Sequence, residues 1–148
     1  MRNSLYSRRS ADIPSSPVVP PGDNGHAPRW VILTVDDNPF VRTIIFQTLG
    51  RRFSLLSAGN GIEALDVLRS NPVDLLLTDI VMPRMDGFKL AGHVRERHPD
   101  LPIVFVSAHL DNETERQAKA ISPHLIYKPF DICHLIETVD SLLSIPTG

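Results

Sequence analysis

The sequence predicts an α/β fold in which a parallel β-sheet is covered by helices on both faces. The main observation is that short apolar segments alternate with helical patterns from about residue 30 onward, an order typical of β-α-β units. The second observation is size: 148 residues, 42% hydrophobic and 22% charged, suit one domain with a core of ordinary extent. No internal repeat interrupts the alternation. We therefore expect a single α/β domain.

Each expected strand is a short apolar segment bounded by polar or turn-forming residues. The five strands are expected over residues 30–35, 53–58, 73–78, 103–107 and 125–127. Four helices are expected between the strands and a fifth after the last one. These helices are expected over residues 39–49, 61–69, 87–97, about 112–120, and 131–143.

The boundaries of the first helix have clear signals. Asn38 is a suitable N-cap, and Pro39 suits the first helical position because it lacks an N–H group that would be unpaired there. Gly50 is placed to end the same helix.

The last two helices differ in polarity. Helix 131–143 carries apolar residues at intervals of three and four, which form one stripe that should lie against the sheet. The segment DNETERQAKA, which supplies helix 112–120, is almost entirely polar. We expect this helix to pack lightly and to shift or fray more readily than the others.

Residues 1–28 are interpreted as a disordered tail rich in proline, serine and arginine, because they show no hydrophobic period. The folded domain is expected over residues 29–145, followed by a short C-terminal tail, residues 146–148. Charge is unevenly distributed between these parts. Residues 1–29 hold four basic and two acidic residues, whereas residues 30–148 hold 11 basic and 15 acidic ones. The acidic character therefore belongs to the folded part.

Composition argues against several classes of protein. A formal net charge of −2 does not suit a direct nucleic-acid binder, which normally has a strongly basic face. A single cysteine, Cys133, cannot form an internal disulfide. No run of 18 apolar residues is present, so membrane insertion is not expected. We expect a cytoplasmic protein.

Polar residues stand at the ends of four of the expected strands. Asp36 and Asp37 follow the first strand, Asp79 follows the third, Ser107 ends the fourth, and Lys128 follows the fifth. In an open parallel sheet, the carboxyl ends of the strands lie along one edge, where ligands bind. We therefore expect these five side chains to meet in one site.

The residue types in this expected site indicate a divalent cation and phosphate. Three carboxylates repel one another unless a positive group lies between them. Oxygen ligands without histidine or cysteine favour Mg²⁺ or Mn²⁺ over zinc. A lysine suits a phosphate group, and a carboxylate can be the nucleophile that forms an aspartyl phosphate. The site therefore predicts phosphoryl chemistry.

Four segments together carry a resemblance to a known family: VDDN, LLLTDIVMPRMDGF, PIVFVSA and YKPF. In this order and spacing, residues 29–144 resemble the receiver domain of two-component response regulators, and in particular a stand-alone receiver similar to chemotaxis regulators. The resemblance implies a flavodoxin-like, doubly wound parallel sheet of five strands in the order 2-1-3-4-5, with five helices. Pro83 and Gly87 fit the loop that leads from the site into a helix, with Asp86 as its N-cap.

The resemblance also implies a Mg²⁺ cofactor and its ligands. Asp36 and Asp37 would be the acidic pair around the ion, with Asp37 the more direct ligand. Asp79 would be a further ligand, and the backbone carbonyl of Val81 another.

The phosphorylation chemistry is implied by the same resemblance. Asp79 would be the phosphoacceptor, Ser107 would donate a hydrogen bond to the phosphoryl group, and Lys128 would contact it. The peptide bond between Lys128 and Pro129 is expected to be cis, a form that occurs in only about 5–6% of X-Pro links in folded proteins. The phosphodonor would be a sensor histidine kinase or a histidine phosphotransfer protein. An unidentified downstream protein would then bind with altered affinity, through the surface formed by the fourth helix, fifth strand and fifth helix.

Three positions set this chain apart from the family pattern. The family usually has an aromatic residue three positions before the lysine, where this chain has Leu125; we hypothesise that Tyr127 or a shift of the polar fourth helix carries the signal instead. The positions that tune water attack on the acyl phosphate are Val81 and His109. Because Val81 cannot orient a water molecule with its side chain, we predict slow autodephosphorylation.

Two alternative functions stay open at the sequence level. One is a protein-docking module that does not depend on phosphorylation. The other, less favoured, is a Mg²⁺-dependent phosphatase with an aspartyl nucleophile, which would need an acid/base carboxylate where the chain has Val81. We therefore do not expect an enzyme with repeated turnover. The chain would only accept a phosphoryl group and hydrolyse it slowly.

Overall fold

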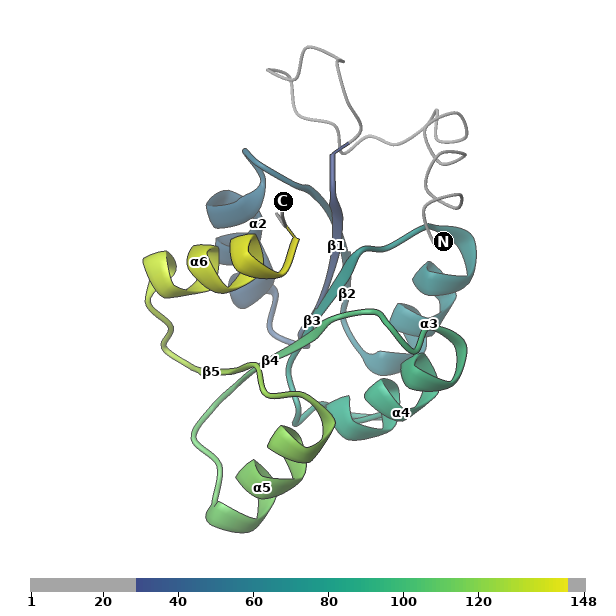
Figure 1. Cartoon of the computed structure of the whole chain (residues 1–148), viewed down its shortest axis with the longest axis vertical. Helices are drawn as coiled ribbons and strands as arrows, with labels where there is room; N and C mark the ends of the chain where they lie inside the picture. The colour runs from purple at the N-terminus through teal and green to yellow at the C-terminus, as the bar shows by residue number, and fades with distance from the viewer. Residues whose placement is uncertain (1–28, 144–148) are drawn as a thin grey trace.

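The structure is a computed structural model and describes residues 29–143. It contains one parallel sheet of five strands in the order β2-β1-β3-β4-β5, together with five helices (Figure 1). The flavodoxin-like α/β fold expected from the sequence is thereby confirmed. The tails expected at residues 1–28 and 146–148 lie outside the described residues, as do residues 144 and 145.

Strands and helices alternate without exception along the described part of the chain. The strands are β1 (Val31–Val35), β2 (Ser54–Ala58), β3 (Leu75–Thr78), β4 (Ile103–Ser107) and β5 (Leu125–Tyr127). The helices are α2 (Pro39–Leu49), α3 (Gly61–Ser70), α4 (Gly87–Arg97), α5 (Asn112–Ile121) and α6 (Ile132–Leu143). All five strands and all five helices were therefore predicted, with bounds that differ by at most two residues.

The largest difference in bounds is at the start of β3, which begins at Leu75 rather than at residue 73. Asp74 explains the difference, because its side chain takes part in the link to β1. The Val31 amide donates to Asp74 Oδ2 at 2.8 Å, while the Asp74 amide donates to the Val31 carbonyl at 2.7 Å. The regular strand pairing therefore starts only after this residue.

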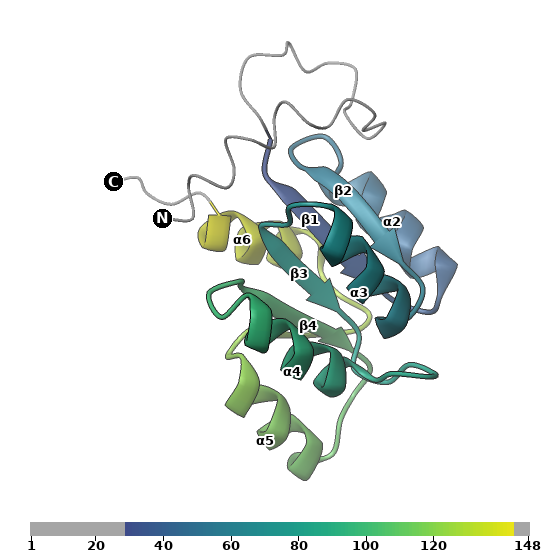
Figure 2. The same cartoon turned by 90° about the vertical axis from the view of Figure 1, so that its right-hand side faces the viewer.

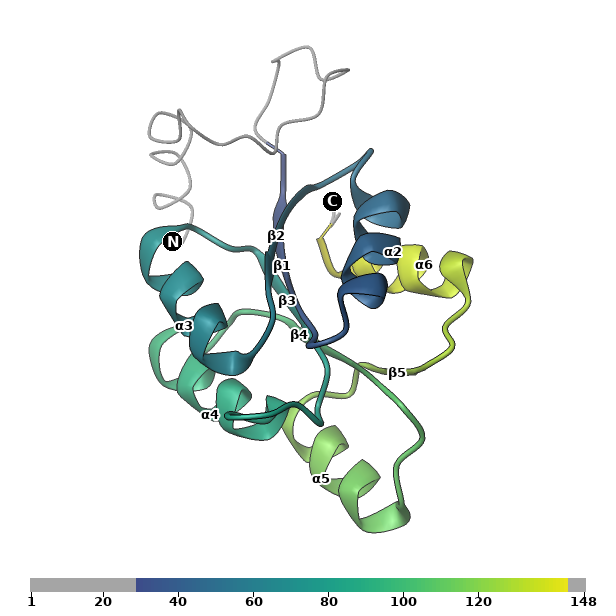
Figure 3. The same ribbon diagram turned by 180° about the vertical axis from the view of Figure 1, so that it is seen from behind.

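Helices cover both faces of the sheet, as Figures 2 and 3 show from the side and from behind. Helices α3, α4 and α5 lie on one face, and α2 and α6 lie on the other. Neighbouring strand residues point to opposite faces, so Leu33 belongs to the core under the first group of helices and Ile32 to the core under the second. Both side chains are completely buried.

The registers of the central strands align their carboxyl ends. Val35 at the end of β1 pairs with Ala58 of β2 and with Thr78 of β3. On the other side of β3, Ser107 at the end of β4 pairs with Tyr127 at the end of β5. Residues that follow these strand ends are consequently placed side by side along one edge of the sheet.

The expected helix caps are present. Asn38 Oδ1 accepts a 2.8 Å hydrogen bond from the Phe40 amide at the start of α2, and Asp86 Oδ1 accepts one of 2.9 Å from the Lys89 amide at the start of α4. Such caps satisfy backbone N–H groups that have no partner inside the helix.

The contrast between the last two helices is also confirmed. Helix α6 buries Leu135, Val139 and Leu143 against the sheet, whereas Ala118 is the one buried residue of α5. Among the described helices, none is long and apolar enough to span a lipid bilayer.

Candidate functional site

The candidate site lies along the carboxyl edge of the sheet and is assembled by backbone hydrogen bonds between strand ends. The Asp36 amide donates to the Ala58 carbonyl at 3.2 Å, and the Asp79 amide donates to the Val35 carbonyl at 2.9 Å. The Lys128 amide donates to the Ser107 carbonyl at 2.8 Å. Together with the pairing of β3 and β4, these bonds place residues from β1, β3, β4 and β5 along one edge.

Lys128 is shared by two carboxylates. Its Nζ atom lies 2.8 Å from Asp36 Oδ2 and 2.9 Å from Asp79 Oδ2. The carboxylates are 3% and 7% exposed and the lysine side chain 22%, so water screens these ion pairs less than it would at the surface. The peptide bond between Lys128 and Pro129 is cis, as expected.

The two carboxylate oxygens of Asp79 differ in their surroundings. Oδ1 accepts hydrogen bonds from Ser107 Oγ at 2.9 Å, from the Ile80 amide at 2.6 Å and from the Val81 amide at 3.4 Å. Oδ2 accepts the Lys128 ammonium at 2.9 Å. One oxygen is thus held by three donors, while the other has a single donor within the described part of the chain.

Asp37 completes an acidic cluster with Asp36 and Asp79. Each of the three residues offers a carboxylate oxygen, and these oxygens lie within 4.8 Å of one another. Asp36 and Asp79 are buried, whereas Asp37 is exposed. Oxygen donors of this kind, without histidine or cysteine, fit a hard divalent cation such as Mg²⁺ and do not fit zinc.

Burial and charge shift two pKa values in this site. Burial raises the pKa of Asp36 above its ordinary value of 3.8 and outweighs the hydrogen bonds from Lys128 and from the Asn38 amide, while the nearby charge of Asp79 raises it further. Burial alone would lower the pKa of Lys128, but its hydrogen bonds and ion pairs with Asp36 and Asp79 together raise it. With Lys128 as its only cationic partner, ionisation of the Asp36 carboxyl group is therefore less favourable than it would be in water.

The loop after β3 is packed tightly beneath Asp79. The Gly87 amide donates to the Ile80 carbonyl at 2.7 Å, and a Cβ atom on Gly87 would lie 2.2 Å from the Asp79 carbonyl oxygen. Arg84 in the loop has a φ of 71°, in the left-handed region that few side chains adopt. Met82 packs in the core. The loop is therefore anchored by this side chain and by the close contact of Gly87 with the Asp79 backbone.

The positions that depart from the family pattern are placed as follows. Val81 is 69% exposed beside the site, and ligation of a metal by its carbonyl stays a prediction. Leu125 and Tyr127 both pack against the core beneath α3, α4 and α5, so they share one face of β5, as expected from their spacing. The Tyr127 hydroxyl donates a 2.8 Å hydrogen bond to Glu115 Oε1. The His109 ring lies 5.7 Å from the Tyr127 ring, centre to centre.

Two neighbours of the site were not predicted from the sequence. Arg42 Nη1 on α2 donates to the Asp36 backbone carbonyl at 2.5 Å and so joins α2 to the end of β1. Glu115 on α5 is the partner of Tyr127. The spacing of Arg42 from Asp36 is a weak signal, since it puts the arginine in the first turns of the following helix, but no sequence signal links Glu115 to Tyr127.

The sequence of this chain is similar to a known protein family and to several known proteins. The sequence profile of the family described as "Response regulator receiver domain" matches residues 32–140. The response regulator receiver protein CpdR of Brucella abortus is 34% identical over 119 residues, which cover 76% of this chain and 95% of CpdR. The DNA-binding transcriptional regulator NtrC of Escherichia coli is 34% identical over 118 residues, covering 78% of this chain. The match spans only 25% of NtrC.

Solved structures of similar proteins have the same fold. The chemotaxis protein CheY4 of Vibrio cholerae superimposes with a TM-score of 0.72 at 27% identity, covering 78% of this chain and 99% of CheY4. The response regulator TrrA of Thermotoga maritima, solved in complex with Mg²⁺ and BeF, gives a TM-score of 0.70 at 30% identity, covering 77% of this chain and 99% of TrrA. The fold of this chain thus has precedents among solved proteins.

Proposed function

Because the chain belongs to the response regulator receiver domain family, we propose that it accepts a phosphoryl group on Asp79 and signals by a change in its affinity for a partner protein. The main support for this proposal is that the two carboxylate oxygens of Asp79 have different hydrogen-bond donors. Oδ1 is held by Ser107 and two backbone amides, whereas Oδ2 accepts only the Lys128 ammonium among the described residues. Oδ2 is accordingly the oxygen available for a new bond.

The proposed transfer takes the phosphoryl group from a phosphohistidine of a sensor histidine kinase or a histidine phosphotransfer protein. A bond forms between Asp79 Oδ2 and phosphorus, the bond between phosphorus and the imidazole nitrogen breaks, and its electron pair stays on that nitrogen. Lys128 and Ser107 then lie within reach of the new phosphoryl oxygens and donate to them. Fixed donors that face developing negative charge are an effective means of catalysis in such transfers.

The donor set of the acidic cluster supports Mg²⁺ as the cofactor. Asp36, Asp37 and Asp79 would hold the ion with the Val81 carbonyl as a further ligand. When bound, Mg²⁺ neutralises charge on the carboxylates and on the phosphoryl oxygens. The raised pKa of Asp36 supports the need for such an additional positive charge.

Exposed apolar side chains around the site support a protein as the phosphodonor. Phe40, at the start of α2, is 77% exposed, Ile44 one turn later is 43% exposed, and Val81 is 69% exposed. Apolar groups clustered at the surface are typical of protein contacts. The acidic character of the folded part supports neither nucleic acid nor an anionic membrane as the direct partner.

We propose no enzymatic turnover beyond self-phosphorylation and slow hydrolysis. An aspartyl phosphatase would need an acid/base carboxylate two residues after its nucleophile, and this position is Val81. The docking surface for the downstream partner is proposed on α5, β5 and α6. A cytoplasmic location is proposed because histidine kinases phosphorylate receivers there, and the exposed free thiol of Cys133 is compatible with a reducing compartment.

Incubation with acetyl phosphate and Mg²⁺, followed by intact mass measurement, tests the proposal. We expect a gain of one phosphoryl group in the wild-type chain, none in Asp79→Ala, and none when EDTA replaces Mg²⁺. No labelling of the wild type would favour a docking module that is independent of phosphorylation. Rapid release of inorganic phosphate with repeated turnover would favour a phosphatase.

A further inference from the structure

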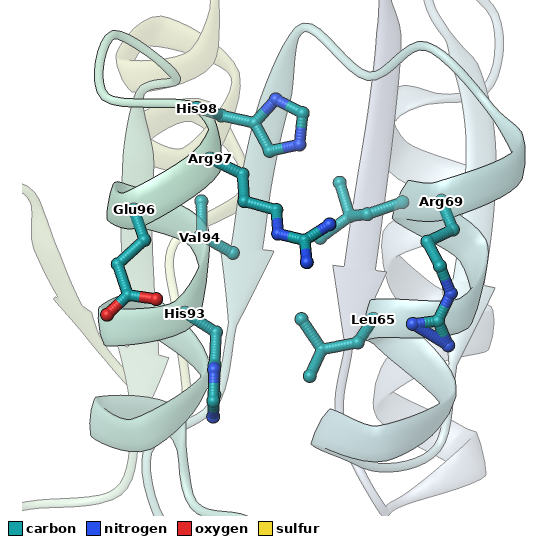
Figure 4. A pocket seen from close by; sticks show the side chains of 8 residues that line it. Leu65, Arg69, His93, Val94, Glu96, Arg97 and His98 are labelled. Carbon is teal, nitrogen blue, oxygen red and sulfur yellow. The ribbon is translucent and has the colours of Figure 1, made fainter.

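A groove between α3 and α4 is separate from the phosphoacceptor site. It encloses about 440 Å³ and is lined by two leucines, one valine, two arginines, two histidines and one glutamate (Figure 4). These residues are Leu65, Leu68, Arg69, His93, Val94, Glu96, Arg97 and His98.

The groove residues lie in α3 from Leu65 onward and at the C-terminal end of α4, with His98 directly after that helix. Helix α3 starts at Gly61 and α4 at Gly87, close to the carboxyl ends of the strands that precede them. The groove therefore lies toward the opposite edge of the sheet from Asp79, and a ligand there would not compete directly for the phosphoacceptor site.

The groove combines an apolar floor with basic groups. Val94 is 1% exposed, and Leu65 and Leu68 pack against the core on the α3 side. In Figure 4, the Leu65 side chain projects from α3 into the space between the helices, and the Arg97 guanidinium reaches into the same space from α4. An apolar surface beside an arginine suits a ligand that has both an apolar and an anionic group.

The two arginines of the groove differ in their acidic partners. The Glu96 side chain points away from the space between the helices (Figure 4). Arg69 forms an ion pair with Asp66 of its own helix, but Arg97 has no ion-pair partner among residues 29–143. A helix C-terminus favours nearby cations, which accounts for arginines at the ends of α3 and α4 but not for the apolar floor between them.

We propose that this groove binds a short acidic segment of a partner protein. A leucine-sized side chain of the segment would pack on Leu65, Leu68 and Val94, and a neighbouring carboxylate would pair with Arg97. Guanidinium binds carboxylate with two parallel hydrogen bonds where the geometry allows, so one acidic residue next to one apolar residue is enough to define the segment. This proposal does not depend on phosphorylation of Asp79.

Charge complementarity favours an acidic partner over the chain's own N-terminal segment. Residues 1–28 contain three arginines and two aspartates, so the segment as a whole has the same sign of charge as Arg97. Nucleic acid would also bring anionic groups, but the negative folded part of the chain would repel its extended phosphate backbone.

The test is an NMR titration of the full-length, ¹⁵N-labelled chain with a blocked peptide, Glu-Glu-Leu-Leu-Glu-Glu. We expect saturable shifts in the amides of α3 and α4 around Leu65 and Val94, weakened by salt. Arg97→Glu should reduce the affinity by about tenfold or more. The matched control is Arg51→Glu, which makes the same change of charge on an exposed arginine outside the groove and should leave binding within about twofold.

Four results would overturn the proposal. They are an absence of saturable shifts, equal binding of the peptide Gln-Gln-Leu-Leu-Gln-Gln, equal loss of affinity in both variants, and equal shifts with inorganic phosphate alone. A second copy of the chain is a further candidate occupant, and sedimentation velocity tests it. If the wild type self-associates and Arg97→Glu does not, the groove binds a second copy and the proposal of an acidic partner segment is wrong.

Discussion

The hydroxyl of Tyr127 at the end of β5 donates a 2.8 Å hydrogen bond to Glu115 of α5. Tyr127 directly precedes Lys128, whose ammonium contacts both Asp36 and Asp79. The hydrogen bond therefore links the lightly packed helix α5 to the strand that carries the lysine. A displacement of Lys128 by an incoming phosphoryl group would act on the strand to which α5 is attached.

Removal of this link should loosen α5. We expect Tyr127→Phe to speed hydrogen exchange of the α5 amides, because Ala118 is the helix's one buried residue and the hydrogen bond joins the helix to β5. The control is Lys119→Gln, which removes only the ion pair between Lys119 and Glu115 on the same helix. Unchanged exchange in Tyr127→Phe would show that the hydrogen bond does not hold α5 in place.

The same hydrogen bond should give a defined pH dependence. The bond from Tyr127 lowers the pKa of Glu115 below its ordinary 4.5, with the contact to Lys119 as a further cause, and the bond to Glu115 raises the pKa of Tyr127 above its ordinary 10.0. The stabilisation from Glu115 is present above pH 4.5 and is lost as the pH falls through its lowered pKa. The stabilisation from Tyr127 is present below pH 10.0 and is lost as the pH rises through its raised pKa.

Urea unfolding of the wild type and of Tyr127→Phe should therefore show a constant difference in unfolding free energy between about pH 6 and pH 9. The difference should shrink on both sides of this range. A difference that grows below pH 4 would contradict the assignment, since a protonated Glu115 no longer favours the phenol as its donor.

Val81 should set the lifetime of the phosphorylated state. We expect Val81→Asn to speed loss of the phosphoryl group by about threefold to tenfold, because an amide can orient a water molecule next to Asp79. Val81→Ala keeps an apolar side chain and serves as the control. Release of inorganic phosphate after removal of acetyl phosphate measures the rate, and equal rates in the two variants would remove the proposed role of residue 81.

Two glycines of helix α4 should respond in opposite directions to the same substitution. A Cβ atom on Gly87 would lie 2.2 Å from the Asp79 carbonyl oxygen, whereas one on Gly92 would meet no atom within 4 Å. Gly87→Ala should lower the free energy of unfolding by about 1–3 kcal/mol and reduce labelling of Asp79. Gly92→Ala should raise it by about 0.5–1 kcal/mol, as expected for a helix interior. Chemical denaturation checks both, and a loss of stability in Gly92→Ala would contradict the open space at this position.

Asp36→Asn should separate stability from metal binding. Burial raises the pKa of Asp36, so its ionised form opposes folding increasingly as the pH rises above 3.8 and through the raised pKa. Without Mg²⁺, the neutral asparagine should therefore give a higher urea midpoint at pH 7. Its affinity for Mg²⁺, measured by calorimetry, should fall by about tenfold or more. A lower midpoint would mean that the ion pair with Lys128 outweighs the cost of burial.

The sequence was sufficient for the elements and for the residues at strand ends, because both depend on local patterns. Continuous apolar segments indicated strands, and Asp79, Ser107 and Lys128 followed or ended three of them. Strand order came from the family resemblance, since no residue pattern distinguishes a neighbour of β1 from a more distant strand. Asn38 was recognised as a cap because its partner, the Phe40 amide, lies only two residues away.

Contacts between side chains of different elements could not be predicted in this way. Glu115 and Tyr127 meet because α5 packs against β5 in one orientation, and the sequence of α5 does not show which strand residue its Glu115 will face. Leu65 and Arg97 line one groove only because α3 and α4 are neighbours on the same face of the sheet. The start of β3 was placed too early because Asp74 pairs with Val31 through its side chain as well as its backbone.

The site is formed by residues next to four strands that are far apart along the chain, so it depends on complete folding of the sheet. Asp36, Asp79, Ser107 and Lys128 come together only when β1, β3, β4 and β5 are all paired in register. A molecule whose sheet is incomplete still contains Asp79, but Lys128 and Ser107 do not contact it. On the proposed function, competence to receive a phosphoryl group would therefore coincide with completion of the sheet.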